Sequence, residues 1–335
     1  MKKTMILTTA LVSMLAVSAN AELKIAGSIE TTYASKEAPA VSGTPTSYDG
    51  NAIGQETKFE FIHTKDLVGG WTSKLDMEVM EVAGTVADTE ITIANGDTSF
   101  FISKDGGSIH DNNVVPGAYN SQPSDNASNS DVDISTGTIH GFYNFGVAQS
   151  IDGIGKVELR YAPDTTTGNT SGDKATGSGG GSGMEYGFSG NFGVDGLTVA
   201  LSKATKTAGQ TSGNDDAEST MIGVAYNFGQ FAVGYSQNDY EDKSGIDNNT
   251  STSTNDAKHM LYGVTFAATD SITLGYNRAV LDEDTDAADE TTDQFEVAYN
   301  LGGATVAFSY QQTEDADGTQ GKDGDAYSIT YKQSF

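Results

Sequence analysis

The chain has no cysteine, so no disulfide stabilises it. Basic residues are few: 18 Lys and Arg stand against 46 Asp and Glu, a formal net charge of −28, which makes nucleic acid a poor partner. No apolar run is as long as the ~20 residues that a membrane-spanning helix needs. A hydrophobic content of 36% and a mean hydropathy of −0.36 also exclude a helical membrane protein. A membrane β-barrel remains allowed, because only every second residue of its strands faces lipid.

The motifs of common catalytic and metal sites are missing as well. The sequence has no P-loop and no dinucleotide fingerprint, and the glycine-rich stretch 177–183 lies in an expected loop. Ser and Asp occur too often near His to select a catalytic triad, so we expect no enzyme and no catalytic residue. The four histidines are scattered without the spacing of a zinc site: His63, His110, His140 and His259.

Residues 1–21 are predicted to be a cleaved signal peptide. A basic pair precedes the apolar run 5–17, and the small residues Ala19 and Ala21 follow at the positions that a signal peptidase requires. The mature chain should therefore begin at Glu22. Export places it in a compartment that permits disulfides, although the chain has none to form.

The last nine residues form a strand with two unlike faces. Tyr327, Ile329, Tyr331 and Phe335 share one parity, and polar residues occupy the other. This pattern fits an edge strand of a soluble β-domain as well as the closing strand of a membrane barrel. The rest of the chain has to decide between them.

The same period-two pattern recurs from residue 22 to the end, separated alternately by short turns and long polar loops. The expected strands are 23–33, 56–61, 71–79, 98–103, 108–113, 139–147, 157–161, 184–192, 197–201, 222–228, 231–235, 260–266, 272–276, 295–301, 306–310 and 327–335. About 16 strands with all long connections at one end predict an all-β fold, a transmembrane antiparallel up-and-down β-barrel formed by residues 22–335. A soluble sandwich has no reason to separate its connections in this way.

Charged residues on the expected inner face support the barrel, because they would disrupt a sandwich core. They are Lys24, Glu30, Glu60, Lys74, Asp76, Arg160, Glu185, Glu296 and Lys332. We expect basic and acidic groups on this face in similar numbers. The basic candidates for the pore wall are Lys24, Lys58, Lys74, Lys156 and Arg160.

With these features the chain resembles the general porins of Gram-negative outer membranes, across residues 22–335. The resemblance rests on the terminal Phe335, the rhythm of strands and turns, and a long third loop at 114–137. It implies a barrel of 16 strands that assembles as a homotrimer in contact with outer-membrane lipid and lipopolysaccharide. Two features depart from the family: Gln333 stands where an apolar residue is usual, and arginine is scarce.

The resemblance also implies roles for particular residues. The third loop would fold into the lumen and place Asp125, Asp131 and Asp133 at the constriction; the alternative is a solvated outer loop. The barrel-assembly machinery would read a terminal signal consisting of Tyr327, Ile329, Tyr331 and Phe335. The trimer contact is expected at Trp71, Leu75, Met77 and Val79, because residues 72–99 contain no aromatic anchor for a lipid interface.

These observations predict a water-filled outer-membrane pore for passive diffusion of small hydrophilic solutes and ions, with a preference for cations. Two alternatives stay open: a channel selective for one solute class, such as sugars or phosphate, and a non-conducting barrel that serves as an adhesin or surface anchor. The acidic stretches 282–290 and 314–325 could bind calcium loosely, but neither has EF-hand spacing. We therefore expect a solvated negative rim and no cofactor.

Overall fold

The computed structural model describes residues 21–37, 50–80, 86–104, 109, 113–123, 142–163, 181–207, 217–241, 256–284 and 286–335. The strands are β1 (Ala21–Glu37), β2 (Gly50–Asp66), β3 (Thr72–Met80), β4 (Val86–Asn95), β5 (Thr98–Lys104), β6 (Tyr143–Ile151), β7 (Gly155–Ala162), β8 (Gly183–Gly190), β9 (Leu197–Lys206), β10 (Ala217–Phe228), β11 (Phe231–Glu241), β12 (Ala257–Ala267), β13 (Ile272–Glu283), β14 (Glu290–Asn300), β15 (Ala304–Glu314) and β16 (Gly324–Ser334). Two short 3-10 turns, η1 (Val68–Gly70) and η3 (Ala316–Gly318), complete the described elements.

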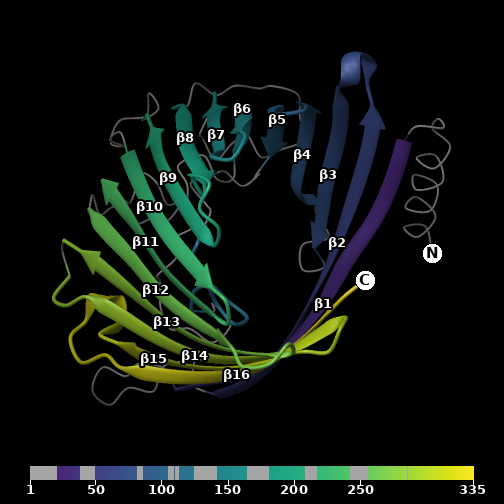
Figure 1. Cartoon of the computed structure of the whole chain (residues 1–335). Helices are drawn as coiled ribbons and strands as arrows, with labels where there is room; N and C mark the ends of the chain where they lie inside the picture. Colours follow the sequence, from purple (N-terminus) through teal and green to yellow (C-terminus); the bar gives the residue numbers. More distant parts are fainter. Residues whose placement is uncertain are drawn as a thin grey trace, which may run out of the picture.

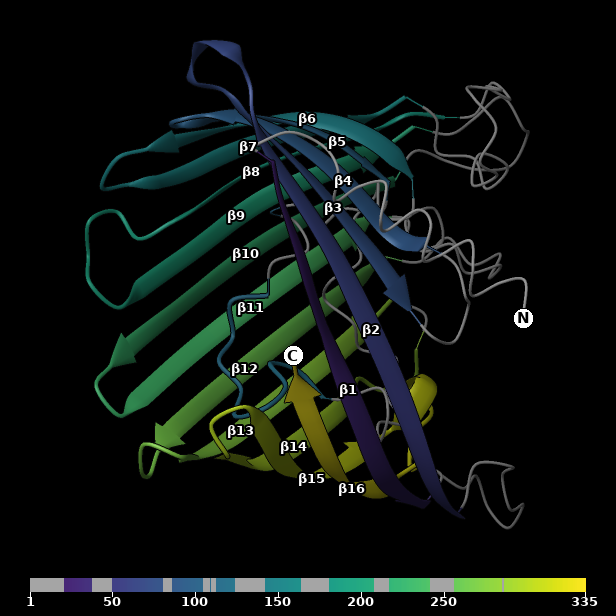
Figure 2. The same ribbon diagram turned by 90° about the vertical axis from the view of Figure 1, so that its right-hand side faces the viewer.

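These strands form one closed antiparallel barrel (Figure 1). Each strand pairs with its neighbours in the sequence, and β1 pairs with β16 to complete the circle. The predicted up-and-down barrel of 16 strands is therefore confirmed. The short turns that join β6 to β7, β8 to β9, β10 to β11 and β12 to β13 all lie at one end (Figure 2).

One part of the predicted strand assignment is wrong. The stretch 98–103 was expected to be the fourth strand, but it belongs to the fifth, and residues 86–95 form the fourth. Gly96 and Asp97 form the two-residue turn between them, with Gly96 at φ 57, and a Gly-Asp pair between two strands is a hairpin signal. The strand expected at 108–113 is not present at its two described residues: Ile109 is a bend and Asn113 has no regular structure.

The connection that follows is consequently longer than the expected loop. It runs from residue 105 to residue 142, because β5 ends at Lys104 and β6 begins at Tyr143. It is still the third connection at its end of the barrel, after those that join β1 to β2 and β3 to β4. Its described residues are Ile109, the segment 113–123 and Phe142.

The two faces of the sheet are inverted relative to a soluble protein. On β10, Met221 is completely buried, whereas its neighbour Ile222 has 47% of its surface exposed. Large apolar side chains on the outward parity are exposed around the barrel, and polar side chains such as Gln294 and Asn277 are buried inside. An apolar outer surface on every strand is typical of a barrel that faces lipid.

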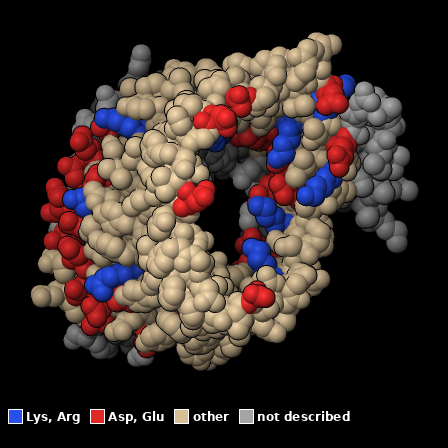
Figure 3. Space-filling view, in the orientation of Figure 1, with Lys and Arg blue, Asp and Glu red and all other residues tan. Residues whose placement is uncertain are grey.

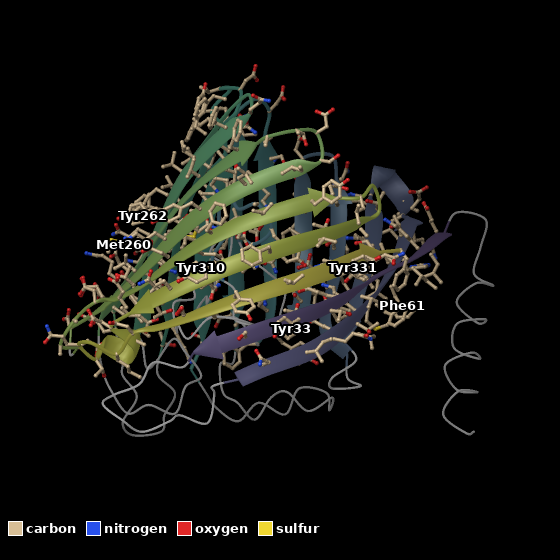
Figure 4. The ribbon with its side chains drawn as sticks, turned by 90° about the horizontal axis from the view of Figure 1, so that it is seen from below. Tyr33, Phe61, Met260, Tyr262, Tyr310 and Tyr331 are labelled. Atoms are coloured by element: carbon tan, nitrogen blue, oxygen red, sulfur yellow. The ribbon has the colours of Figure 1, made fainter. Side chains whose placement is uncertain are left out.

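Aromatic side chains lie on this outer surface near the ends of the strands. Figure 4 shows Tyr33, Tyr310 and Tyr331 on the outer side of β1, β15 and β16. The Tyr33 and Tyr327 ring centroids are 6.4 Å apart across the β1 and β16 seam. At the turn end, Phe228 and Phe231 stack at 5.7 Å. Such girdles mark the two interfaces of a membrane.

The C-terminal residue closes the seam. The backbone N–H of Phe335 donates to the Gly27 carbonyl, and the N–H of Gly27 donates to the Phe335 carbonyl, both at 3.0 Å. The Phe335 ring lies over Gly27, where a Cβ atom would be 2.7 Å from the ring carbon Cζ. It also meets the edge of the Phe59 ring at 5.7 Å between centroids. The ring thus covers the gap that a glycine leaves on the outer face.

Candidate functional site

The inner wall formed by β1, β2, β3 and β16 carries solvent-accessible ion pairs. Lys74 Nζ lies 2.6 Å from Asp76 Oδ2, and its side chain is 46% exposed. Lys58 pairs with Glu78 across β2 and β3. Figure 3 shows a hollow centre with basic and acidic side chains gathered along the margin formed by these strands. Water and ions can reach this wall.

Arg160 on β7 occupies a different setting, because it is only 3% exposed. Its Nε donates to Glu158 Oε1 at 2.6 Å, and its Nη1 donates to Glu90 Oε2 at 3.2 Å and Asn144 Oδ1 at 3.3 Å. The guanidinium also lies 4.7 Å from the centre of the Phe101 ring. These contacts fix Arg160 as a cross-link of β4, β5, β6 and β7, and its charge is largely balanced by two carboxylates.

Carboxylates outnumber basic groups on the inner face of the described strands, so the expected balance is wrong. The missed fourth strand contributes Glu90, and β14 begins with the buried Glu290. The inward basic groups are Lys24, Lys36, Lys58, Lys74, Lys156, Arg160, Lys206 and Lys332. The inward carboxylates are Glu22, Glu30, Glu56, Glu60, Asp66, Asp76, Glu78, Glu90, Glu158, Glu185, Glu283, Glu290 and Glu296.

The described part of the third loop, residues 113–123, contacts the inward-facing side of β10 to β14. Glu296 Oε2 accepts hydrogen bonds from the backbone N–H of Tyr119 at 3.0 Å and of Asn120 at 3.1 Å. The Asn120 amide donates to Glu296 Oε1 at 3.3 Å, and Asn277 Nδ2 donates to the Asn120 carbonyl at 2.9 Å. Figure 2 shows this blue-teal segment crossing β11, β12 and β13.

Apolar and local contacts support the same segment. Val115 is 3% exposed and lies in a cluster with inward residues of β10 to β13, including Leu261 and Leu281. Asn113 holds the two ends of the segment together: its Oδ1 accepts from the Val115 N–H at 2.9 Å, and its Nδ2 donates to Ser121 Oγ at 3.2 Å.

Burial raises the pKa of the Tyr119 phenol well above its usual value, and the carboxylates of Glu30, Glu296 and Glu56 raise it further. These acids come from β1, β14 and β2, so Tyr119 lies where the segment approaches the seam of the barrel. The phenol is neutral at every physiological pH. A neutral hydroxyl beside carboxylates can donate a hydrogen bond without adding charge.

The structure brings together only some of the predicted site residues. Lys24, Lys58, Lys74, Lys156 and Arg160 all face inward, and their role in conduction stays a prediction. The loop carboxylates Asp125, Asp131 and Asp133 lie outside the described residues. So does Ala19, the first of the two alanines at the predicted cleavage site. At the cleavage site, Ala21 and Glu22 begin β1.

The residues predicted for the trimer contact lie on the outer face at β3. Leu75, Met77 and Val79 share the outward parity, and Trp71 precedes the strand. The Trp71 ring lies 5.8 Å from Phe100 of β5. Neither β3 nor β4 carries an aromatic side chain, in contrast to the strands of the opposite wall.

Sequence reasoning missed the role of Glu296 as an acceptor for the third loop, and the contribution of Asn277. The available signal was weak: Glu296 is an inward acid in a strand with no basic residue. A buried carboxylate without a basic partner usually accepts several N–H groups.

Comparison with known proteins identifies the family. A family model described as Gram-negative porin matches residues 8–335. The chain belongs to the Gram-negative porin family. No sequence among the curated proteins matches it.

Solved outer-membrane proteins, porins among them, share the fold at low sequence identity. A loop-deletion mutant of OmpT, an outer-membrane protein of Vibrio cholerae, has a TM-score of 0.67 at 16% identity, covering 94% of this chain and 100% of that chain. The anion-selective porin from Comamonas acidovorans has a TM-score of 0.63 at 12% identity, again over 94% and 100%. A mutant of the Rh. blastica porin has a TM-score of 0.62 at 15% identity, with the same coverage.

Family and fold together make this chain a porin channel of the Gram-negative outer membrane. Within the described residues, no helix is both long and apolar enough to cross a membrane. No group of three or more His, Asp or Glu side chains in the described part of the chain is arranged to hold a metal ion.

Proposed function

We propose that this porin forms a water-filled pore through which small hydrophilic solutes and ions diffuse passively. The observation that carries the proposal is the accessible charged wall of β1, β2, β3 and β16 around a hollow centre (Figure 3). A barrel that served only as an anchor would have no need for partly exposed ion pairs on its inner face, such as Lys332 and Glu30, whose charged atoms lie 3.1 Å apart. Charged rings and walls of this kind are what ion pathways use.

We propose further that the pore prefers cations. The excess of inward carboxylates over basic groups gives the wall a negative potential, and a low-dielectric wall focuses that field on the lumen. The predicted loop carboxylates at 125, 131 and 133 would add to it if the rest of the third loop follows the segment 113–123 along the wall. Screening acts over ~8 Å at physiological salt, so charges inside the lumen matter more than charges on the outer loops.

The inner face offers little support for a channel that is selective for sugars or phosphate. A sugar channel needs inward aromatic rings, and Phe101 is covered by the Arg160 guanidinium. A phosphate channel needs an excess of inward basic groups, whereas the described strands carry an excess of acids. General diffusion therefore fits the lumen better than recognition of one of these solutes.

The assembly proposed is a homotrimer that contacts its neighbours through the outer face of β3. Leu75, Met77 and Val79 make that face apolar without the aromatic ends that lipid-facing strands carry elsewhere. Lipid and lipopolysaccharide would surround the remaining strands. The terminal residues Tyr327 to Phe335 would serve recognition by the barrel-assembly machinery.

The experiment that tests the pore is conductance of the purified protein in a planar bilayer. We expect stepwise increases of current as single molecules insert, and swelling of liposomes in solutions of small neutral sugars. A correctly folded barrel that inserts without any current step would refute the pore and favour the anchor. Current steps without sugar permeation would favour a selective channel.

A further inference from the structure

We infer that four glycines on the inner wall form a seat for the third loop and so set the free width of the pore. They are Gly223 on β10, Gly234 on β11, Gly263 on β12 and Gly275 on β13. We call these residues the glycine track. The inference rests on the proposed pore function and concerns the residues that determine its width.

The track lies on consecutive strands and on a single face. All four glycines have the inward parity, because residues two positions away on the same strand are buried. Examples are Met221 beside Gly223 and Leu261 beside Gly263. Gly234 and Gly263 are direct partners in the pairing of β11 with β12. Each of these four neighbouring strands therefore has one inward position without a side chain, and we call the depression along these positions the groove.

Segment 113–123 occupies this groove. A Cβ atom added to Gly223 would lie 2.7 Å from Val114 Cγ2. One added to Gly234 would lie 2.5 Å from Pro116 Cδ and 3.0 Å from the Val115 Cα. Real Cβ atoms do not approach other heavy atoms so closely, so each glycine is needed for the loop to lie where it does.

The contacts at the other two positions involve the loop backbone. A Cβ atom at Gly263 would lie 2.6 Å from the Pro116 carbonyl oxygen. At Gly275 the three nearest atoms all belong to Ala118, beginning with its backbone nitrogen at 2.8 Å. Backbone atoms cannot rotate away as the end of a side chain can, so a methyl group here has to displace the segment itself.

Any displacement of the segment has one open direction, away from the wall and toward the lumen. How closely segment 113–123 approaches the strand backbone at the glycine track thus determines how much of the cross-section of the pore the loop occupies. Gly187 on β8 also lies against the loop, although less specifically: a Cβ atom there would lie 2.9 Å from Cγ2 of the buried Ile109 and 2.7 Å from the Leu201 carbonyl oxygen of β9. Exclusion size would then be determined partly by the absence of side chains at the track, and not only by charged residues.

Gly54 on β2 provides a matched control. It has the same inward parity as Glu56, yet a Cβ atom added there would meet nothing within 4 Å. A Gly→Ala change at such a position is neutral or slightly stabilising, because it restricts the unfolded chain without a clash. If a Gly→Ala change at the glycine track has a larger effect than Gly54→Ala, the difference therefore reports contact with the third loop.

The test uses a cysteine reporter, which the cysteine-free chain makes unambiguous. Val115→Cys is introduced at a site that is 3% exposed, and the folded protein is treated with a small charged thiol reagent that can enter the pore. We expect slow labelling in V115C and in V115C with G54A. Adding G234A or G275A should raise the rate about 10-fold or more; tenfold corresponds to ~1.4 kcal/mol, within the cost of one inserted methyl group in a packed contact.

Rapid labelling of V115C alone, or equal rates with and without G234A and G275A, would overturn the inference. Single-channel conductance of G275A and G54A without the reporter gives a second measurement, should V115C fail to fold. G275A should change the open-channel conductance and G54A should leave it at the parental value; identical conductance in both would contradict the seat. Absence of conductance in the parent protein would instead refute the proposed pore, while the labelling result would still test the seat.

Discussion

Replacement of Glu296 by alanine should release the third loop from the wall. Its carboxylate accepts the backbone N–H groups of Tyr119 and Asn120 and the side-chain amide of Asn120. Glu296 is completely buried, so the change leaves these donors with no protein acceptor in the same place. Each buried donor left unsatisfied costs ~1–3 kcal/mol, although water entering from the lumen would recover part of it.

We therefore expect the free energy of local opening at Tyr119 and Asn120 to fall by ~2–4 kcal/mol. Amide hydrogen exchange in a peptide containing these residues should become ~30-fold to ~1,000-fold faster, since exchange from local openings follows that free energy. Glu296→Gln keeps one acceptor oxygen and should give an intermediate rate. The barrel strands should retain their protection in both variants.

Glu60→Gln supplies the control for charge. Glu60 faces the lumen on β2 opposite Glu78, away from β14, so its neutralisation removes one inward charge and leaves the bonds to Glu296 intact. Exchange at Tyr119 and Asn120 should match the parent protein in E60Q. Unchanged exchange in E296A, or equal acceleration in E60Q, would refute the reasoning.

Three further predictions follow from other parts of the structure. Deletion of Phe335 should lower the yield of heat-modifiable barrel without affecting export, because it removes the closing pair with Gly27; a normal yield would contradict this. The double substitution Leu75→Glu and Val79→Glu should give monomers on native gels, because an unpaired charge in an apolar contact between subunits is costly. Trimers that survive both substitutions would exclude this contact. Because the pKa of Tyr119 is raised, the packing of Tyr119 against the wall should be stable below pH ~10, the ordinary tyrosine value, and weaken above it. In a titration followed by tyrosinate absorbance, the increase that the parent protein shows and Y119F lacks should lie above that pH. An increase at or below pH ~10 would disprove the burial argument.

The barrel itself could be predicted from the sequence because its main signal is local. Alternation along β10 to β16 fixes which side chains face lipid, and an antiparallel meander needs no distant information to place each strand beside the next. Phe335 was recognised in the same way, as the end of an alternating strand. Its contact with Gly27, more than three hundred residues away, could not be read from that pattern.

The fourth strand was missed because its alternation is interrupted. In the sequence of residues 86–95, Ile91 and Ile93 share one parity, but Ala87 and Thr89 continue that parity without a large apolar residue. The Gly96–Asp97 pair was the better signal, since glycine followed by aspartate between two strands indicates a two-residue hairpin turn. Giving it more weight would have placed Glu90 on the inner wall beside Arg160.

The seat of the third loop was beyond sequence reasoning for a different reason. Isolated glycines inside strands such as Gly263 and Gly275 indicate that some backbone or ligand approaches closely, but they do not say which one. The loop that fills the groove comes from residues 113–123, over a hundred positions earlier in the chain. Only the closed barrel brings the two together.

The cation preference depends on where fixed charge lies relative to the ion path. The inner wall carries an excess of carboxylates on described strands, and the predicted third-loop carboxylates would lie nearest the constriction. Acids that lie farther from the ion path than the ~8 Å screening length affect mainly the rate of entry, and we expect this of acids on outer loops. The two groups to compare are Asp125, Asp131 and Asp133 in the third loop, and Asp282, Asp284 and Asp286 at the rim.

The most direct test is the zero-current potential of the porin in a planar bilayer under a salt gradient. We predict the sign of a cation-selective channel, a shift toward zero when the three third-loop aspartates are changed to asparagine, and a much smaller shift for the three rim aspartates. The shift should shrink at high salt, where screening is stronger. A potential with the sign of an anion-selective channel, or selectivity lost only in the rim variant, would contradict the account.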